Sequence, residues 1–437
     1  MHIFDFFAEF TSTASRAWAM SHFAVPHQQR PKRKLPSKPV VHDLSFHLER
    51  AFFPFPSPPV LPVASTTAAP AHMPLELILL IIEASYDHRH PDISLLKACS
   101  LVSRDWSLSV QKLLFRRVTL QNQQAFDAFS WAVNPATERG AILGSAVRDL
   151  CVVVDYSQPA YLHQRAMGLA VSLCPNLQEL DLSVYGQVGS PRLCRQAPAF
   201  DPETLDLLRS GPKITSLSFS NWSENQDCLF QLLDVWPSIR SLSMSGTSAH
   251  LPPQLPPFKA SLEQLRINFQ TPPSMEFMAW LLHHSVGSLR TATFERDPCP
   301  DLVHFIINSF ASTLCSLSIP NCNSPDVTKN LQRCEKLRFI RMDQPQINPV
   351  VYKSLPASVS HLALGVDRDT PLQPVIDLVK TRSALELVTI RLWNGGDSHR
   401  LLPALKIACA YRGVELCLTK DTRLYRSMLV CDLLLGF

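Results

Sequence analysis

Few residues of this chain could do chemistry on their own, and their spacing specifies no reaction. The closely spaced pairs His88-x-His90 and His283-His284 could contribute metal ligands, but a zinc site needs three or four ligands and neither pair has others near it in sequence. The 437 residues include 13 glycines and contain no Gly-x-Gly-x-x-Gly, Gly-Lys-Ser/Thr, His-Glu-x-x-His or Gly-x-Ser-x-Gly. We therefore expect no enzyme activity, no cofactor and no metal. A Cys/His nucleophile pair that meets only in the fold stays open.

Cysteine usage and charge set the expected environment. The 12 cysteines occur singly, without any Cys-x-x-Cys, which favours buried thiols in a reducing compartment over a disulfide framework. The basic run at 30–34 is either a nuclear import signal or a solvated charge cluster, so we expect a cytoplasmic and/or nuclear protein. No apolar run approaches the roughly 20 residues that span a bilayer. The net charge of +4 gives no indication of nucleic acid, and neither membrane nor nucleic acid is an expected partner.

A binding surface is the better candidate for function, because one short pattern repeats along the chain. An apolar residue, two variable ones, an apolar one, one variable and an apolar one occur in copies that start at residues 177, 214, 239, 262, 289, 314, 337, 359 and 385. Apart from the first, the steps lie within the period of roughly 20–29 residues of leucine-rich repeats, which this region resembles. Such units stack strand on strand and present a concave parallel sheet.

The third and fifth residues of each copy should face outward on that sheet, because side chains alternate along a strand. Small hydroxylic residues fill most of these positions, as a solvated sheet face would have. An aromatic residue beside an arginine is instead typical of an interface anchor. Stacked copies would bring the bulky members into one patch, which we expect to bind an unidentified protein target. The patch consists of Phe339, Arg341, His361 and Leu387.

The flanking segments complete an α/β organisation. Residues 1–72 are rich in proline and are expected to be a disordered leader. Residues 121–437 should form an irregular solenoid, in which helices alternate with the strands. A strand at 147–152 is expected to be its first rung and one at 414–418 its last. A helix at 424–435 would close the exposed edge of the sheet.

Between leader and solenoid, three short helices are predicted in residues 73–120. Pro74 suits the first turn of a helix, where its missing N–H costs nothing, and Glu76 meets the helix dipole. After a polar break at 87–92, one helix should run from 93 to 100 and another from Ser103, a plausible N-cap, to Phe115. So small a bundle has little core of its own and would gain from an apolar partner.

These residues resemble the F-box family. The pattern Leu-Pro-x-Glu-Leu-Ile reads here from Met73 to Ile78, the Leu-Val-Ser-Arg-x-Trp stretch reads from Leu101 to Trp106, and a closing Leu-Phe is at 114–115. The sequence departs from the family pattern in two places: Met73 stands in place of leucine, and the break at 86–91 is a few residues longer. The longer break could alter the angle between the helices and so the affinity for the adaptor. The resemblance implies that an apolar face docks on a Skp-type adaptor, formed by Pro74, Leu77, Ile78, Ile81, Leu101, Val102 and Trp106.

The resemblance therefore implies a substrate-receptor subunit of a Skp-cullin-F-box ubiquitin ligase, with the ligase chemistry in other subunits of the cullin-RING assembly. Such a receptor works by proximity, since it raises the effective concentration of the target at the transfer site. The alternative is a solenoid scaffold for protein interactions, in which the three helices only cap the stack and recruit no adaptor. Whether Pro74, Ile78 and Trp106 are exposed or turn inward separates the two.

Overall fold

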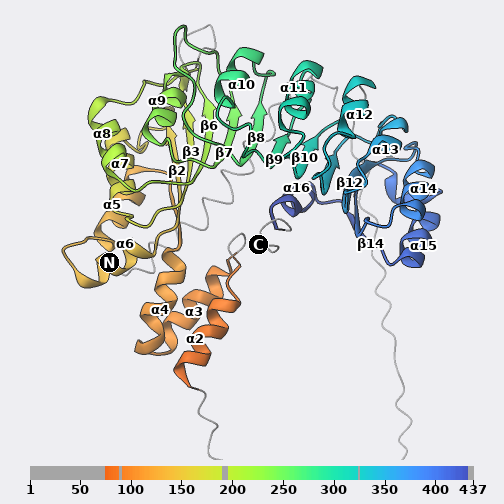
Figure 1. Ribbon diagram of the computed structural model, residues 1–437. Coiled ribbons are helices and arrows are strands. Elements are labelled where there is room, and N and C mark those ends of the chain that lie inside the picture. The colour runs from red at the N-terminus through yellow and green to blue at the C-terminus, as the bar shows by residue number, and fades with distance from the viewer. Residues whose placement is uncertain (1–73, 88–90, 189–194, 323–324, 432–437) are drawn as a thin grey trace, which may run out of the picture. The chain divides into compact units, whose positions relative to one another are not determined.

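The computed structural model describes residues 74–87, 91–188, 195–322 and 325–431 (Figure 1). The expected leader at 1–72 and the pair His88-x-His90 lie outside them. The chain divides into two compact units, with a boundary between Pro91 and Asp92. The three helices expected for residues 73–120 all form, but the first belongs to the smaller unit and the other two to the larger one. Each unit is therefore described by itself.

In the smaller unit, helix α2 spans Leu75–Ala84. Glu76 lies in the first turn, as the sequence predicts, whereas Pro74 is the N-cap residue just before the helix and not part of its first turn. Ile82 is buried, whereas Leu77, Leu80 and Ile81 are exposed. A helix that leaves so many large apolar side chains in solvent presents a surface for something else to cover.

The larger unit begins with two helices that pack against each other, α3 (Ile93–Val102) and α4 (Arg104–Phe115). Each starts at an N-cap: the Leu95 amide donates to Asp92 Oδ1 at 2.9 Å, and the Trp106 amide donates to Ser103 Oγ at 3.2 Å. Helix α4 also packs against α6 (Glu138–Ala146). Leu96 belongs to the core here, as do Val110 and Leu114 in α4.

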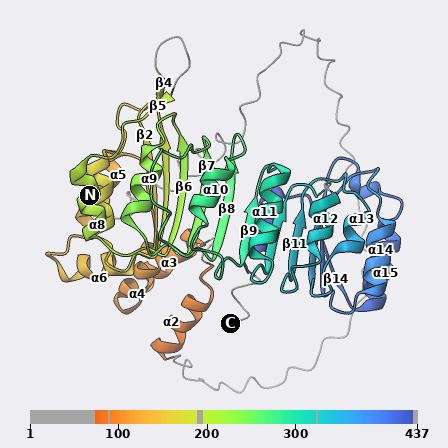
Figure 2. The same ribbon diagram turned by 45° about the horizontal axis from the view of Figure 1, so that its top comes forward.

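A single sheet of 12 parallel strands follows, with the strands in chain order (Figures 1 and 2). Because neighbouring strands run the same way, each crossover must carry the chain back along the sheet, in most cases through a helix. The strands are β1 (Arg117–Leu120), β2 (Asp149–Asp155), β3 (Glu179–Tyr185), β6 (Ser216–Trp222), β7 (Ser241–Gly246), β8 (Gln264–Phe269), β9 (Thr291–Phe294), β10 (Ser316–Ile319), β11 (Phe339–Met342), β12 (His361–Val366), β13 (Leu387–Leu392) and β14 (Glu415–Thr419). A small antiparallel pair, β4 (Gln187–Val188) and β5 (Arg195–Gln196), projects from the loop after β3.

The strand prediction is confirmed in detail. In the 12-stranded sheet, every strand from β3 to β13 begins at the third residue of a repeat copy. The strands expected at 147–152 and 414–418 form as β2 and β14, but β1 precedes β2 in the sheet, so β2 is not the first rung. The register aligns copy with copy, for instance Leu217 with Leu242 and Leu242 with Leu265. The apolar positions of the pattern are buried in the core, as Leu180, Leu217 and Leu242 show. The fold is thus a repeating parallel α/β arrangement, as a solenoid has.

Helices cover the face of the sheet to which these apolar positions point (Figure 1). Several of them are amphipathic, with buried leucines, isoleucines and valines on one side. These crossover helices are α5 (Gln123–Ala132), α6, α7 (Gln164–Ser172), α8 (Pro202–Ser210), α9 (Asp227–Val235), α10 (Met275–Leu281), α11 (Pro300–Phe310), α12 (Pro325–Leu331), α13 (Val350–Ser354), α14 (Gln373–Thr381) and α15 (Leu402–Arg412), with a short 3-10 turn η1 (Gly396–Ser398) before α15.

The opposite face, which we call the inner face, carries the third, fifth and seventh residues of the repeats. Along β2, β3, β6 and β7 these residues are half-buried, except for the exposed Glu179, and they alternate with buried residues that are mostly apolar. Strands β10, β11 and β12 are instead buried at every position. The expectation that all outward positions face solvent is therefore wrong for this half of the sheet. Ser318, for example, is fully buried.

One cause is the last helix, α16 (Thr422–Cys431). The helix expected at 424–435 begins at Thr422 and is described to Cys431, while 432–435 lie outside the described residues, and it does more than close the edge beside β14. It turns back over the inner face, contacts β13 and β14, and inserts Tyr425 against Phe339 and Ala363 (Figure 1). Its start is fixed by Asp421, whose Oδ1 accepts from the amide of Arg423 at 2.7 Å.

Candidate protein-binding surface

The sheet brings the residues of the expected target-binding patch together. The register pairs Phe339 with His361 and His361 with Leu387, while Arg341 lies beside Ala363. Phe339 and His361 meet edge to face with ring centroids 4.6 Å apart. The adjacency inferred from the repeat spacing is thus correct.

The accessibility of this patch differs from the expectation. Phe339 and His361 each expose 6% of their surface and Arg341 exposes 1%, while Leu387 is half-buried. Tyr425 of α16 covers Phe339, and its ring faces the Arg341 guanidinium at 5.9 Å. The four residues therefore do not form an open patch, because helix α16 already lies on the surface to which Phe339 and Arg341 belong.

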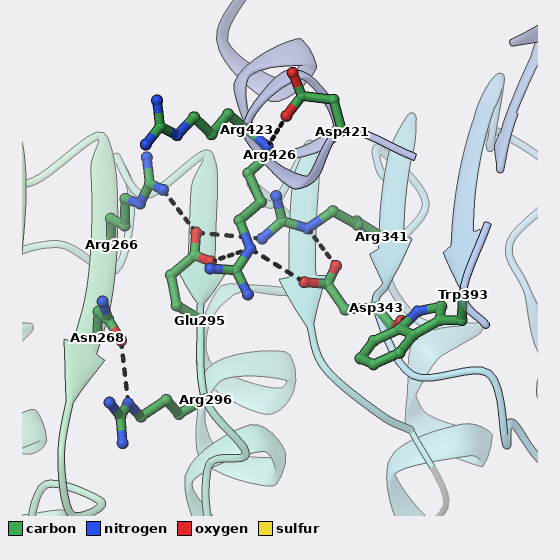
Figure 3. A network of polar contacts seen from close by, with 10 residues as sticks. All are labelled: Arg266, Asn268, Glu295, Arg296, Arg341, Asp343, Trp393, Asp421, Arg423 and Arg426. Atoms are coloured by element: carbon green, nitrogen blue, oxygen red, sulfur yellow. Dashed lines mark hydrogen bonds and ion pairs between the residues drawn. The ribbon is translucent and has the colours of Figure 1, made fainter. Parts of the chain in front are cut away.

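Two buried carboxylates organise the polar side of the same surface (Figure 3). Glu295 follows β9 directly, and its Oε1 is 2.8 Å from Arg266 Nη2 and 3.3 Å from Arg341 Nη2. Asp343 follows β11 directly, and its Oδ1 is 2.9 Å from Arg341 Nε. The sheet's own arginines thus contact one oxygen of each carboxylate.

The second oxygen of each carboxylate faces Arg426 of α16. Arg426 Nε lies 3.1 Å from Glu295 Oε2 and 3.6 Å from Asp343 Oδ2. Figure 3 shows the Arg426 side chain extending from the helix at the top to a position between the two acids, while the Arg341 side chain approaches from the right. The two carboxylates therefore share one guanidinium from the sheet, that of Arg341, and one from the helix, that of Arg426.

The ionisation of these acids follows from their surroundings. Burial opposes ionisation of Glu295, but Arg266, Arg341 and Arg426 together outweigh it and hold the pKa of this carboxyl below its ordinary value. Burial raises the pKa of Asp343, and the two arginines that it contacts offset this only in part. Removing Arg426 would raise both pKa values, because each acid would lose an opposite charge at close range.

Further polar residues frame the network. The Trp393 indole donates from Nε1 to the Asp343 carbonyl oxygen at 2.9 Å, and the Arg391 guanidinium stacks 4.3 Å from the centroid of the Trp393 ring. On the other side, Arg296 Nε donates to Asn268 Oδ1 at 3.3 Å. These contacts fix the ends of the strands around the two acids (Figure 3).

The sequence interpretation missed the acids and the helix residues that meet them. Glu295 and Asp343 occupy the seventh position of their repeat copies, the next outward position after the fifth. Extending the period-2 alternation by one step would have placed both on the inner face. Tyr425 and Arg426 carry no local signal, because their partners are far away in the sequence.

The first half of the inner face has a different character. Asp149 of β2 is in register with Glu179 of β3, and Asp181 lies two residues further along β3. Tyr185 stacks on Trp222 of the next strand at a centroid distance of 6.4 Å. Burial raises the pKa values of Glu179 and Asp181, and the nearby acid Asp149 adds to the effect at Glu179.

The expected adaptor-binding residues are placed as follows. Leu77 and Ile81 of α2 are 50% and 56% exposed, and Leu101 and Val102 at the end of α3 are 68% and 62% exposed. Pro74 is exposed as well, while Ile78 and Trp106 are half-buried. Apolar side chains are thus in solvent on α2 and on α3, which the structure describes in separate units.

Nothing in the described residues points to a reactive centre. Ten cysteines within the described ranges are unpaired, and burial raises the pKa of Cys174 to about 12 and that of Cys322 to about 11. Within the described ranges, no three metal-ligating side chains gather, and no helix is long and apolar enough to cross a membrane. No protein-family model matches the chain, and no curated protein matches it either.

Proposed function

We propose that this chain is the substrate-receptor subunit of a Skp-cullin-F-box ubiquitin ligase. In this role, α2, α3 and α4 bind a Skp-type adaptor and the inner face of the sheet binds the target protein. The exposed apolar side chains of α2 and α3 carry the proposal, because they coincide with the positions that the F-box resemblance assigns to the adaptor. Large apolar residues that a helix leaves in solvent commonly mark a protein interface.

The repeat region supports the second half of the proposal. A long parallel sheet whose inner face carries polar and aromatic side chains offers a surface on which a folded or extended partner can rest, most directly along β2, β3, β6 and β7, where side chains of that face are accessible in part. The chain then acts by holding the target near the ligase, and its own residues perform no bond-making step.

Adaptor binding is the direct test. Full-length chain is co-expressed with a Skp-type adaptor and purified, as wild type and as the double variant Ile81→Asp/Leu101→Asp. Both side chains are exposed, so the free chain should tolerate the change, whereas in the complex each aspartate would be buried without a partner. We expect co-purification to fall by roughly a hundredfold or more, which corresponds to a loss of about 3 kcal/mol of binding free energy.

Ile407→Asp is the matched control. It places the same charge at an equally exposed isoleucine, 70% accessible, on α15 of the repeat region. If the control and the double variant bind the adaptor equally well, α2 and α3 do not form the adaptor interface. A wild-type chain that recruits no adaptor at all would leave the scaffold as the remaining function.

A further inference from the structure

Helix α16 places two adjacent side chains into the inner face in different ways. Tyr425 is buried between the floor formed by Phe339 and Ala363 and the guanidinium of Arg341. Arg426 reaches the free oxygens of Glu295 and Asp343. By contrast, Arg423 and Leu424 on the same helix are exposed. One aromatic and one arginine side chain of the helix thus reach into the inner face, and such side chains dominate interfaces between separate proteins.

The receiving site is complete without α16. Glu295, Asp343, Arg266 and Arg341 come from the sheet, and their charges cancel among themselves. The remaining oxygens of the two acids still point to one place, and the apolar floor lies beside it. A planar guanidinium can contact two carboxylates at once, whereas a lysine ammonium acts as a single point charge. The chemistry of the site therefore favours an aromatic side chain next to an arginine.

The fit of α16 to this site is incomplete. Arg426 Nε and Glu295 Oε2 are close enough for an ion pair, but among the described residues neither atom has an aligned hydrogen bond. The buried Tyr425 hydroxyl also has no hydrogen-bond partner there. Buried polar groups without aligned partners weaken an interaction, so a segment with better geometry at these atoms would bind more tightly than α16 does.

We propose that this site recognises a target segment with an aromatic residue followed by arginine, and that α16 is an internal copy of that segment which the target displaces. The inference rests on the proposed role of the inner face in target binding. Only Lys420 and Asp421 separate β14 from α16, so the tethered helix competes at high effective concentration with any segment added from outside. A target must be better matched than α16, or α16 must first be released.

A peptide with the sequence of residues 419–431, carrying Cys431→Ser and a fluorescent label, is the probe. Its binding is measured by fluorescence anisotropy to the full-length wild-type chain and to the full-length variant Tyr425→Ala/Arg426→Ala, whose own helix can no longer fill the site. We expect the variant to bind the peptide at least roughly tenfold more tightly than the wild type does. Equal binding by the two chains, or no binding to the variant up to about 1 mM peptide, a typical tethered concentration, would overturn the proposal.

Changes in the peptide then test the chemistry without touching the fold of the receptor. Arg426→Lys and Tyr425→Ala in the peptide should each weaken binding by roughly tenfold or more, while Tyr425→Phe should bind as well as the original or more tightly. Arg423→Lys is the matched control, because Arg423 is exposed on the same helix. If Arg426→Lys and Arg423→Lys have the same effect, the acid pair does not select arginine and the proposal is wrong.

Two controls keep the result interpretable. Should the double variant lose its cooperative unfolding transition, the single variant Arg426→Ala takes its place as receptor. Sedimentation of the wild type reports whether α16 of a second copy occupies the site instead, and a stable dimer would contradict the intramolecular arrangement. The peptide assay uses the purified chain alone, so it can succeed where adaptor binding fails and the reverse.

Discussion

Removing the buried arginine of the sheet should destabilise the repeat region far more than removing the exposed one. Arg341 contacts both Glu295 and Asp343, and 1% of its side chain is accessible. In Arg341→Met, the two acids stay buried and lose the more deeply buried of the two cations that they share, while Arg426 remains. Breaking a buried pair in this way costs up to about 3–5 kcal/mol, because the remaining arginines compensate the buried charge only in part. Arg266→Met is the comparison: this side chain is 44% accessible, so water can partly replace it beside Glu295, and its loss should cost less than the loss of Arg341.

The free energy of unfolding from urea titrations measures both effects, and pH separates their cause. The arginines hold the Glu295 pKa below its ordinary value, so the stabilisation from this carboxylate is fully present above the unfolded pKa of about 4.3 and is lost as pH falls through the folded pKa. The cost of Arg341→Met should therefore be largest near neutral pH and shrink below that range. Replacing both acids by their amides in the Arg341→Met background should recover part of it. Equal costs for Arg341→Met and Arg266→Met would refute the reasoning.

Three further predictions concern the sheet and its thiols. Leu242→Asp places a charge among buried side chains and should lower the free energy of unfolding by about 2–5 kcal/mol. Ser243→Asp, one position along on the inner face, should change it by less than about 1 kcal/mol. Similar values for the two variants would mean that the strand register is wrong. Burial raises the pKa of Asp181 in the folded chain, so its ionised form lowers the free energy of unfolding at neutral pH. Asp181→Asn should therefore raise the melting temperature at pH 7, and this gain should vanish near pH 4, close to the unfolded pKa of about 3.9. A gain in melting temperature that is the same at both pH values would contradict the prediction. Cys174 and Cys322 should resist alkylation at pH 8 in the folded chain and react in urea, since burial raises the pKa of their thiols to about 12 and about 11; rapid labelling in the folded chain would argue against their burial.

The strands could be predicted from the sequence because their pattern is set by burial. Three apolar positions in each copy must face the helix layer, and this requirement repeats from Leu177 to Ile390 whatever the intervening loops do. The same alternation placed Phe339, His361 and Leu387 side by side correctly. Local start signals were equally informative, since Ser103 caps α4 as expected.

What covers the inner face could not be predicted in this way. The position of α16 depends on contacts between Tyr425 and Phe339 and between Arg426 and Glu295, residues separated by 86 and 131 positions. The hydrophobic period of a segment shows which side of a helix is apolar. It does not show against which distant strand that side packs. Glu295 itself lay one step beyond the six-residue pattern and could have been found.

The most direct test of the receptor role is the mass of the assembly that the full-length chain forms. The chain is mixed with a purified Skp-type adaptor and the amino-terminal half of its cullin, and the complex is followed by sedimentation at about micromolar concentration, within the range of specific interfaces. The account predicts one species that contains all three proteins and that fails to form with Ile81→Asp/Leu101→Asp. A wild-type chain that sediments alone beside an intact adaptor–cullin complex would contradict it.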